Sequence, residues 1–225
     1  MRVRAGGELA ALFYAHQGRL AHKWNHYLPI YERHMARFRG DRGRPVRMLE
    51  IGISQGGSLQ LWRKYFGPEA IIFGVDVDPR CRVIDGSDLA VRIGSQADPE
   101  FLRRVISEMG GADIIIDDGS HLASHHRITF QTLFPLLDAH GVYIVEDLHT
   151  SYFPSYDGGV RRSGTFIEEM KLLVDDIHAW YSEAGTHVPD AEKTVNGIHF
   201  YDSIVVIEKK PKEKPVQVTV GNPSF

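Results

Sequence analysis

The most constraining feature of the sequence is a regular alternation of short apolar segments with amphipathic segments between residues 47 and 146. The apolar segments are rich in β-branched residues and are bounded by Gly, Pro or Asp, which is typical of buried strands. They are Arg47–Ile53, Ile71–Asp76, Ala90–Ile93, Asp113–Asp117 and Gly141–Glu146. The segments between them with helical periodicity are Ser58–Phe66, Pro99–Met109 and about Ser124–Leu137. This alternation predicts a doubly wound α/β fold, with a parallel sheet covered by helices on both faces.

The flanking segments extend this sheet at both ends. From about Glu8 to Phe38, apolar and aromatic residues recur every three or four positions, which predicts a helical segment within residues 1–40. A further amphipathic helix is expected at Thr165–Ala184. Residues 197–210 alternate in two short runs around a tight turn, which predicts a C-terminal antiparallel hairpin. Residues 209–225 are a tail that forms either a mobile extension or an edge strand, and residues 1–225 are expected to be a single domain.

Charge and composition limit the classes of function. The 225 residues include 26 basic and 29 acidic side chains, and a net charge of −3 gives no field that would hold a nucleic acid or an anionic membrane. No segment approaches the roughly 20 apolar residues of a membrane span, and the N-terminal stretch lacks the pattern of a signal peptide. The single cysteine, Cys81, cannot form an intrachain disulfide. These features predict a cytoplasmic protein with no nucleic-acid or membrane partner.

Polar residues stand at the carboxyl end of every predicted parallel strand, which is where ligands bind in such sheets. The first strand carries Glu50 and leads into Gly52, Gly56 and Gly57, where the backbone can approach a ligand closely. This spacing departs from the G-x-G-x-x-G fingerprint of dinucleotide-binding proteins, because Ser54 takes the place of the middle glycine. An acid stands two residues before the first glycine. It suits a ligand that is a nucleoside bearing an amino acid better than it suits a ligand with a pyrophosphate. The alternative is a tight strand-to-helix turn without a ligand.

Two residues at neighbouring strand ends suit the other parts of a nucleoside. Asp76 ends the second strand, where an acid can accept hydrogen bonds from both ribose hydroxyls. Gln96 follows the third strand and could meet an adenine edge. A solvated strand-end carboxylate and a surface amide are the respective alternatives. The pair therefore indicates a nucleoside without identifying the cofactor.

Three carboxylates follow two strands that should be neighbours. Asp118, Glu146 and Asp147 would repel one another in one crevice unless they were protonated or held a cation. Oxygen ligands favour magnesium, manganese or calcium over zinc. The alternative is that one or two of them are helix caps or solvated strand ends. His121 lies three residues after Asp118 on a loop, and because imidazole titrates near neutral pH it is a candidate general base.

The segment 149–164 has the composition of a lid, with a proline and a Gly pair among aromatic residues. Its aromatic residues are Tyr152, Phe153 and Tyr156. Aromatic faces can cover the apolar faces of sugar rings, but the same side chains could instead anchor the loop to the core.

Several motifs together resemble the S-adenosylmethionine (SAM)- and magnesium-dependent O-methyltransferases that act on sugars of natural products, of the mycinamicin and demethylmacrocin type. The resemblance runs from about Lys23 to Lys209, and its most specific part is IDDGSH followed by VEDL. It implies a Rossmann-like class I methyltransferase sheet, mostly parallel, with N-terminal helices. The motifs that carry it include KWNHYLPIYERH, LEIGISQGGSLQLWRKYFG, GVDVDP, IIIDDGSH, GVYIVEDLHTSY and IHFYDSIVVIEK.

The resemblance also implies roles for individual residues. It implies that Asp118, Glu146 and Asp147 ligate Mg²⁺ and that His121 is the general base. The implied SAM contacts are Glu50, Gly52, Ser58, Asp76, Gln96 and Asp118. The implied reaction is methyl transfer to a hydroxyl of a glycosylated natural product or of a polysaccharide such as a mannoside. The expected partner is a small-molecule or oligosaccharide acceptor, and a homodimer or higher homo-oligomer is left open.

Three other functions are considered for this chain. A catechol-type O-methyltransferase would use the same metal, since vicinal aromatic hydroxyls chelate magnesium as a sugar diol does. An NAD-dependent oxidoreductase predicts the G-x-G-x-x-G fingerprint and no carboxylate cluster, the reverse of what this chain has. A non-catalytic binding module would be expected to have lost a metal ligand, whereas all three carboxylates and His121 are present.

Overall fold

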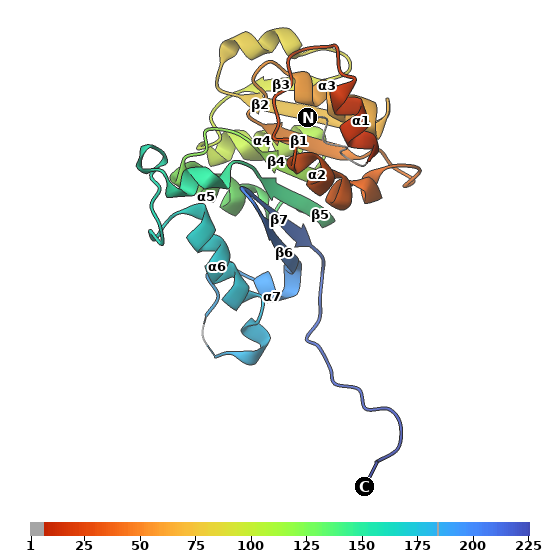
Figure 1. The fold of residues 1–225 in the computed structure, drawn as a ribbon, viewed down its shortest axis with the longest axis vertical. Coiled ribbons are helices and arrows are strands. Elements are labelled where there is room, and N and C mark those ends of the chain that lie inside the picture. The colour runs from red at the N-terminus through yellow and green to blue at the C-terminus, as the bar shows by residue number, and fades with distance from the viewer. Residues whose placement is uncertain (1–6, 184) are drawn as a thin grey trace.

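The computed structural model describes residues 7–183 and 185–225. Its centre is a seven-stranded sheet in the order β3-β2-β1-β4-β5-β7-β6 (Figure 1). Strands β1 to β5 run parallel, whereas β7 pairs antiparallel with both β5 and β6. The predicted mostly parallel sheet with a C-terminal antiparallel hairpin is confirmed. The strands are β1 Arg47–Ile51, β2 Ile71–Asp76, β3 Ala90–Ile93, β4 Ala112–Asp117, β5 Leu137–Val145, β6 Val195–Tyr201 and β7 Ile204–Lys209.

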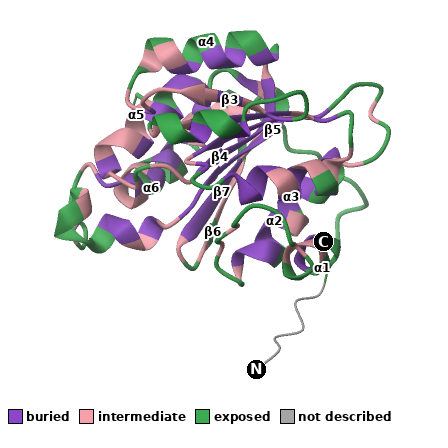
Figure 2. Cartoon of the chain, turned by 90° about the horizontal axis from the view of Figure 1, so that it is seen from above, coloured by how far each residue is buried: buried purple, intermediate pink, exposed green. Residues whose placement is uncertain are grey.

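Helices cover both faces of the sheet, and the buried strands lie between the two helical layers (Figure 2). One layer consists of α1 Glu8–Tyr14, α2 Tyr27–Met35 and α3 Gly57–Phe66. The other consists of α4 Pro99–Met109, α5 Ala123–Leu133 and α6 Phe166–Asp176, and a short helix α7, Ala191–Thr194, precedes β6. Because successive strand residues point to opposite faces, each strand contributes to two separate hydrophobic cores. In the described part of the chain, no helix combines the length and apolarity needed to cross a membrane.

Helix α4 shows how local sequence determines an element. The Asp98 carboxylate accepts hydrogen bonds from the backbone N–H groups of Glu100 (3.0 Å) and Phe101 (3.1 Å), and Pro99 suits the first helical position. Gly110, in the left-handed conformation, ends the helix. The predicted bounds of this helix, Pro99–Met109, are therefore confirmed. The buried face carries Leu102, Val105, Ile106 and Met109, at the three- and four-residue spacing of one helix face.

The prediction of helical structure from about Glu8 to Phe38 is wrong for residues 15–26, which we call the strap. These residues join α1 to α2 without forming a helix or strand, and the strap passes over the start of α3. A Cβ atom on Gly57 would lie 2.4 Å from the carbonyl oxygen of Arg19 and 2.3 Å from that of Leu20. Close backbone packing of this kind, together with the ion pairs of Lys23 described below, overrides the helical periodicity. Residues 1–6 of the predicted segment 1–40 lie outside the residues that the structure describes.

Three predicted boundaries near the first and last parallel strands are also wrong. Strand β1 ends at Ile51 rather than Ile53, because Gly52 turns the chain with a φ of +83°. Helix α5 ends at Leu133 rather than Leu137, because Pro135 cannot continue a helix. Strand β5 consequently begins at Leu137, four residues before the predicted start.

The last predicted helix and the tail differ from expectation as well. Helix α6 ends at Asp176, whose carboxylate accepts hydrogen bonds from the N–H groups of His187 (2.8 Å) and Val188 (2.7 Å) and so holds the returning chain against it. The predicted end at Ala184 lies outside the described residues. After Lys209 the chain forms no strand, so the edge-strand alternative for the tail is wrong, and the tail leads away from the sheet (Figure 1).

The buried histidine of α5 makes stability depend on pH. His126 is fully buried against the ring of Phe166, and burial lowers the pKa of His126 to about 3, although Asp117 Oδ1 lies 3.9 Å from its Nε2. In the unfolded chain a histidine takes up a proton as the pH falls below about 6.5, whereas folded His126 does so only near the lower value. The free energy of unfolding should therefore decrease as the pH is lowered from about 6.5 to about 3. At a pH of about 5, His126 should account for a loss of about 2 kcal/mol.

Urea unfolding of wild type and His126→Leu at neutral and mildly acidic pH measures this contribution. We expect the variant to lose less stability on acidification, because leucine has no proton to gain in the unfolded chain. His178→Leu, which removes an exposed imidazole, should behave as wild type. Equal acid sensitivity of wild type and His126→Leu would contradict the assignment.

Candidate active site

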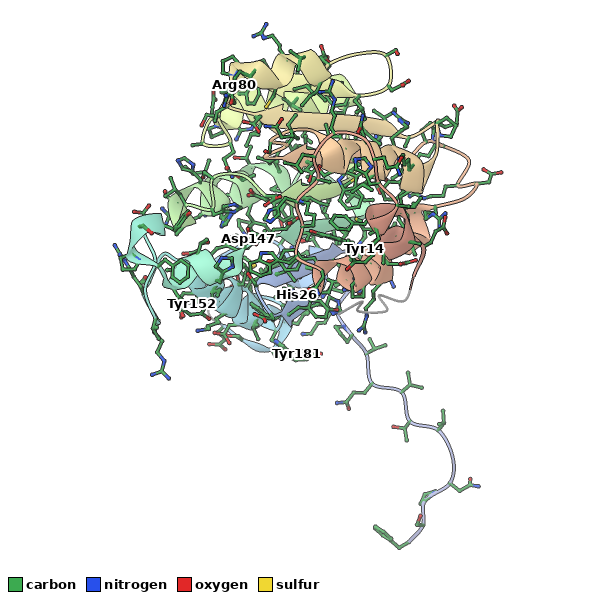
Figure 3. All side chains as sticks on the ribbon, turned by 45° about the horizontal axis from the view of Figure 1, so that its top comes forward. Tyr14, His26, Arg80, Asp147, Tyr152 and Tyr181 are labelled. Atoms are coloured by element: carbon green, nitrogen blue, oxygen red, sulfur yellow. The ribbon has the colours of Figure 1, made fainter. Side chains whose placement is uncertain are left out.

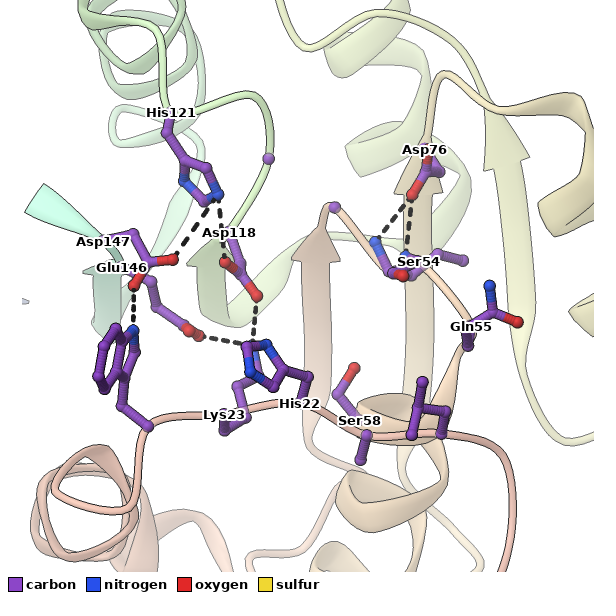
Figure 4. A pocket seen from close by; sticks show the side chains of 16 residues that line it. His22, Lys23, Ser54, Gln55, Ser58, Asp76, Asp118, His121, Glu146 and Asp147 are labelled. Atoms are coloured by element: carbon purple, nitrogen blue, oxygen red, sulfur yellow. Dashed lines mark hydrogen bonds and ion pairs between the residues drawn. The ribbon is translucent and has the colours of Figure 1, made fainter. Parts of the chain in front are cut away.

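A cavity of about 310 Å³ opens at the carboxyl ends of β1, β2, β4 and β5 (Figure 4). Its walls come from the loops that follow these strands and from residues 20–24 of the strap. The sequence therefore predicted the correct edge of the sheet. The predicted site residues that line the cavity are Gly52, Ser58, Asp76, Asp118, His121, Glu146 and Asp147.

The strap brings a lysine into the middle of the predicted carboxylates. Lys23 Nζ lies 2.6 Å from Asp118 Oδ2, 2.8 Å from Glu146 Oε1 and 3.1 Å from Glu50 Oε1. The Lys23 side chain is only 4% exposed, and the pKa of Lys23 is raised well above its usual range because the attraction of these carboxylates outweighs the effect of burial. Sequence reasoning did not assign Lys23 to the site. The only available signal was its place at the head of the motif KWNHYLPIYERH.

The carboxylates of the cavity remain in excess over this ammonium group. Burial, and then repulsion from Asp118, raise the pKa of Glu146 to about 8 even though Lys23 opposes the rise. Burial also raises the pKa of Asp118. Glu50 is a third carboxyl group paired with Lys23, and Asp147 adds a fourth in the cavity. The site therefore favours the binding of further positive charge.

His121 faces two of these carboxylates. Its Nε2 lies 3.9 Å from Asp118 Oδ1 and 3.8 Å from Asp147 Oδ2 (Figure 4). The backbone is in the left-handed region at His121 (φ 59°), at Asp147 (φ 55°) and at Ser54 (φ 47°), all of which line the cavity. Such conformations cost about 1–3 kcal/mol each and concentrate at functional sites. The observed strain is therefore consistent with a functional position for this loop edge.

The side chains near the cavity that could hold a metal form two groups that share Asp118. One group is Asp118, His121 and Asp147, and the other is Glu50, Asp118 and Glu146; within each, one potential ligand atom per residue lies within 4.8 Å of the others. The predicted set of Asp118, Glu146 and Asp147 is present in one cavity, but Glu146 Oε1 is paired with Lys23. A donor set dominated by carboxylate oxygens suits Mg²⁺.

Asp147 is oriented by two aromatic residues that sequence reasoning missed. Its Oδ1 accepts a hydrogen bond from Trp24 Nε1 (3.0 Å) and another from the Tyr27 hydroxyl (2.8 Å). Because Oδ1 is held in this way, Oδ2 turns toward His121 (Figure 4). Trp24 and Tyr27 belong to the same motif as Lys23, so the strap and the start of α2 arrange the whole carboxylate group.

Ser58 lines the cavity, and Glu50 lies behind it within the core. Glu50 is fully buried, and its Oε2 accepts hydrogen bonds from Ser58 Oγ (2.7 Å) and Trp62 Nε1 (3.0 Å). Its other oxygen faces Lys23. Glu50 thus anchors the strap to the sheet, and its predicted contact with a cofactor stays a prediction.

Asp76 holds the glycine loop in place. Its Oδ2 accepts hydrogen bonds from the backbone N–H groups of Ile53 (3.1 Å) and Ser54 (3.0 Å), and its Oδ1 accepts one from that of Asp78 (2.9 Å). Gly52 is required here, since a Cβ atom on it would lie 1.9 Å from the carbonyl oxygen of Asp118. The carboxylate still borders the cavity at the position predicted for a ribose.

Gln96 is buried, so the surface-amide alternative is wrong. Its Nε2 donates a hydrogen bond to Asp117 Oδ1 (3.0 Å), and its Oε1 accepts one from the Ser120 N–H (2.6 Å). Gln96 borders a second cavity of about 230 Å³ that also contacts Gly52 and Asp76. The predicted adenine position therefore has space beside it, although both ends of the amide are engaged within the protein.

The lid segment lies beside the acidic cavity. The side chains of Tyr152 and Phe153 are 47% and 46% exposed, and the ring of Phe153 lies 5.6 Å from that of His149. Tyr152 is seen at the side of the molecule in Figure 3, with Asp147 nearer the middle. The ring of Tyr156 lies 6.4 Å from that of His121. Tyr156 is thus the lid aromatic residue placed against a predicted catalytic group.

Comparison with known proteins finds relatives among O-methyltransferases. The chain is 41% identical over 215 residues to the 8-demethyl-8-(2-methoxy-alpha-L-rhamnosyl)-tetracenomycin-C 3'-O-methyltransferase of Streptomyces olivaceus, covering 90% of this chain and 54% of the relative. It is 36% identical over 197 residues to the mycinamicin VI 2''-O-methyltransferase of Micromonospora griseorubida, covering 81% of this chain and 48% of that protein. The chain is a homologue of sugar O-methyltransferases. No protein-family model matches it.

Solved structures give the same result for the fold. MycE methyltransferase from the mycinamycin biosynthetic pathway, in complex with Mg and SAH, matches this homologue with a TM-score of 0.75 at 32% identity, covering 88% of this chain and 51% of that chain. A MycE complex with Mg, SAH and mycinamycin VI matches with a TM-score of 0.73 at 34% identity, covering 82% of this chain and 49% of that chain. The class I methyltransferase fold and the predicted resemblance are confirmed. The chain spans about half the length of the curated relatives it matches.

Removal of the buried ammonium group tests how far the site depends on it. In Lys23→Met the three carboxylates lose their cation, and breaking a buried ion pair on one side costs about 3–5 kcal/mol. We expect the free energy of unfolding to fall by this amount in the absence of divalent cations. Added Mg²⁺ should stabilise the variant more than it stabilises wild type, because the remaining carboxylates bind a cation more strongly.

Chemical unfolding with and without Mg²⁺ measures both effects, and Lys64→Met, which changes an exposed lysine, is the matched control. A loss of stability in Lys23→Met no larger than in Lys64→Met would contradict this account of the site.

Proposed function

We propose that this homologue transfers a methyl group from SAM to a hydroxyl group of a sugar in a Mg²⁺-dependent reaction, with His121 as the general base. The observation that carries the proposal is the position of His121 Nε2, which is flanked by Asp118 Oδ1 and Asp147 Oδ2 in an acidic cavity. Both named relatives are O-methyltransferases, and MycE was solved with Mg and SAH. The acceptor we propose is a sugar-bearing small molecule, and no nucleic-acid or membrane partner is part of the proposal.

The residues proposed for Mg²⁺ are Asp118, Glu146 and Asp147. A bound Mg²⁺ would supply positive charge that orients the acceptor hydroxyl and makes it more acidic. Asp118 directs Oδ2 to Lys23 and Oδ1 toward His121. Its Oδ1 could therefore bind Mg²⁺ while Oδ2 keeps its ion pair with Lys23. Trp24 and Tyr27 hold Asp147 in position from the opposite side.

His121 would take the proton of the acceptor hydroxyl on Nε2. The acceptor oxygen then forms a bond to the SAM methyl carbon while the bond from that carbon to sulfur breaks, and the sulfonium charge disappears. The carboxylates that flank His121 would stabilise the imidazolium that forms. Since the reaction joins a nucleophile to a cation, the protein contributes chiefly positioning and exclusion of water.

The proposed SAM site runs along the glycine loop. Glu50, Gly52, Ser58, Asp76, Gln96 and Asp118 are the residues proposed to hold or border SAM. The acidic cavity would favour the sulfonium, and the second cavity beside Asp76 and Gln96 has room for the base. We also propose that residues 1–225 work as one cytoplasmic methyltransferase domain in which residues 149–164 cover the bound acceptor, with Tyr152, Phe153 and Tyr156 against it.

A methyl-transfer assay tests the proposal. The protein would be incubated with SAM and Mg²⁺ together with a rhamnosylated polyketide, an oligomannoside or a catechol, and the products analysed by mass spectrometry. We expect methylation of a sugar hydroxyl and its loss when the metal is removed by chelation. Methylation of the catechol alone would support the catechol-type alternative, and no methylation of any acceptor while SAM binds would contradict the proposed reaction.

Replacement of the general base should separate catalysis from binding. In His121→Ala we expect the rate of transfer to fall by about 10²–10⁴-fold, because the imidazole that would take the proton is removed. The affinity for SAM should be unchanged, as measured by calorimetry. His140→Ala, which removes an exposed histidine, is the control. Normal turnover by His121→Ala would show that the base is wrongly assigned.

A further inference from the structure

A second cluster of metal-binding residue types lies where the last turn of α2 crosses the C-terminal hairpin. It consists of His34 on α2, His199 on β6 and Glu208 on β7. In the ladder of the hairpin, Gly197 is paired with Glu208, so His199 is two residues along β6 and on the same face of the sheet. Three separate elements therefore direct these side chains to one point. None of the three takes part in the proposed methyl transfer.

The contacts of each Glu208 oxygen are close in length to the distances between ligand atoms around a small tetrahedral ion. His34 Nδ1 lies 3.2 Å from Glu208 Oε1, and His199 Nε2 lies 3.7 Å from Glu208 Oε2. Ligand atoms around zinc, at bond lengths of about 2.0–2.1 Å, lie about 3.4 Å apart in a tetrahedron. One potential ligand atom from each residue lies within 4.8 Å of the others. Small side-chain movements would bring the three onto one ion.

One of the ligands, His34, is already held by a second hydrogen-bond partner. His34 is 3% exposed, and its Nε2 lies 2.9 Å from the hydroxyl oxygen of Tyr201. When Nε2 donates its hydrogen to the Tyr201 hydroxyl, Nδ1 faces Glu208 Oε1 at 3.2 Å with its lone pair, and this contact is then favourable with either a proton or a metal ion between the two atoms. Metal-bound histidines commonly have their second nitrogen fixed by such a partner.

The third ligand has an unused coordinating atom. His199 Nε2 is buried and has no hydrogen-bond partner among the described residues, whereas the His199 side chain as a whole is 34% exposed. A buried polar atom without a partner is costly unless something binds it. The partial exposure of His199 gives an ion a path from solvent, and the remaining coordination position can be filled by water.

We propose that His34, His199 and Glu208 form a binding site for a divalent transition-metal ion of the zinc type. Two imidazoles with one carboxylate suit zinc, cobalt or nickel, whereas the carboxylates of the active site suit Mg²⁺. Burial lowers the pKa of His34, so its ring is neutral, the form that binds metals. The two sites therefore select different ions.

The proposed ion would join α2 to the hairpin. At its other end, α2 already meets the hairpin turn through Tyr27, whose hydroxyl lies 2.9 Å from the Ser203 carbonyl oxygen, and Tyr27 orients Asp147. An ion at the His34 end would pin α2 at both ends. It would thus stabilise the helix that carries the strap and part of the active site, without itself touching substrate.

Titration of the full chain with Zn²⁺ in excess Mg²⁺ tests the proposal without reference to activity. Excess Mg²⁺ occupies the carboxylate cavity, whereas it competes poorly for imidazole nitrogens. We expect calorimetry to show one Zn²⁺ ion bound per chain. His199→Asn and Glu208→Gln should each lower the affinity for this ion about tenfold or more. Both residues are partly exposed, so these variants should fold. Zinc should raise the midpoint of thermal unfolding in wild type and raise it less in both variants.

Two control variants distinguish the sites. His140→Asn removes an exposed histidine outside the cluster, and Asp147→Asn removes a carboxylate of the active site. Both control variants should bind Zn²⁺ as wild type does, whereas His199→Asn should not. Zinc binding that survives in His199→Asn and Glu208→Gln but is lost in Asp147→Asn would overturn the proposal, as would the absence of zinc binding to wild type.

Discussion

The ion pairs of Lys23 are the interaction on which the rest of the site depends. Glu50 comes from β1, Asp118 follows β4 and Glu146 follows β5, so one ammonium group joins the ends of three adjacent strands. Because the Lys23 side chain is buried, these carboxylates would repel one another strongly without it. The strap that carries Lys23 therefore forms one wall of the cavity, and its ammonium group reduces the repulsion among the carboxylates in the folded protein. The remaining negative charge is what suits the cavity to a second cation.

The chain around the cavity is also strained and closely packed. Arg19 and Leu20 of the strap press against Gly57 at the start of α3, and Gly52 approaches the backbone of Asp118. His121 and Asp147 accept left-handed backbone conformations that turn their side chains toward each other. Stability lost at these positions is recovered in the two hydrophobic cores that lie on either face of the sheet. A rigid sheet with a strained edge is a common way to hold catalytic groups in position.

Much of this arrangement could be predicted from the sequence, and the rest could not for physical reasons. The strands β2 and β3 and the helix α4 follow from local patterns, and parallel strand ends necessarily bring Asp118, His121 and Asp147 to one edge. The helical prediction is wrong for the strap because Leu20 and Trp24 continue the helical spacing of the flanking residues, whereas the conformation of the strap is determined by contacts with residues far along the chain. The pairing of Lys23 with three distant carboxylates leaves no local pattern. The cluster of His34, His199 and Glu208 is likewise assembled by the register of a hairpin and a helix crossing.

The measurement that tests the central claim most directly is calorimetric titration of the purified protein with SAM and with NAD, each in the presence of Mg²⁺ and of a chelator. The acidic cavity, the glycine loop and the relatives named above all lead us to expect selective binding of SAM at micromolar concentrations. Binding of NAD in preference to SAM, or no binding of SAM in either condition, would contradict the account and leave the carboxylate group as a cation site without an assigned reaction.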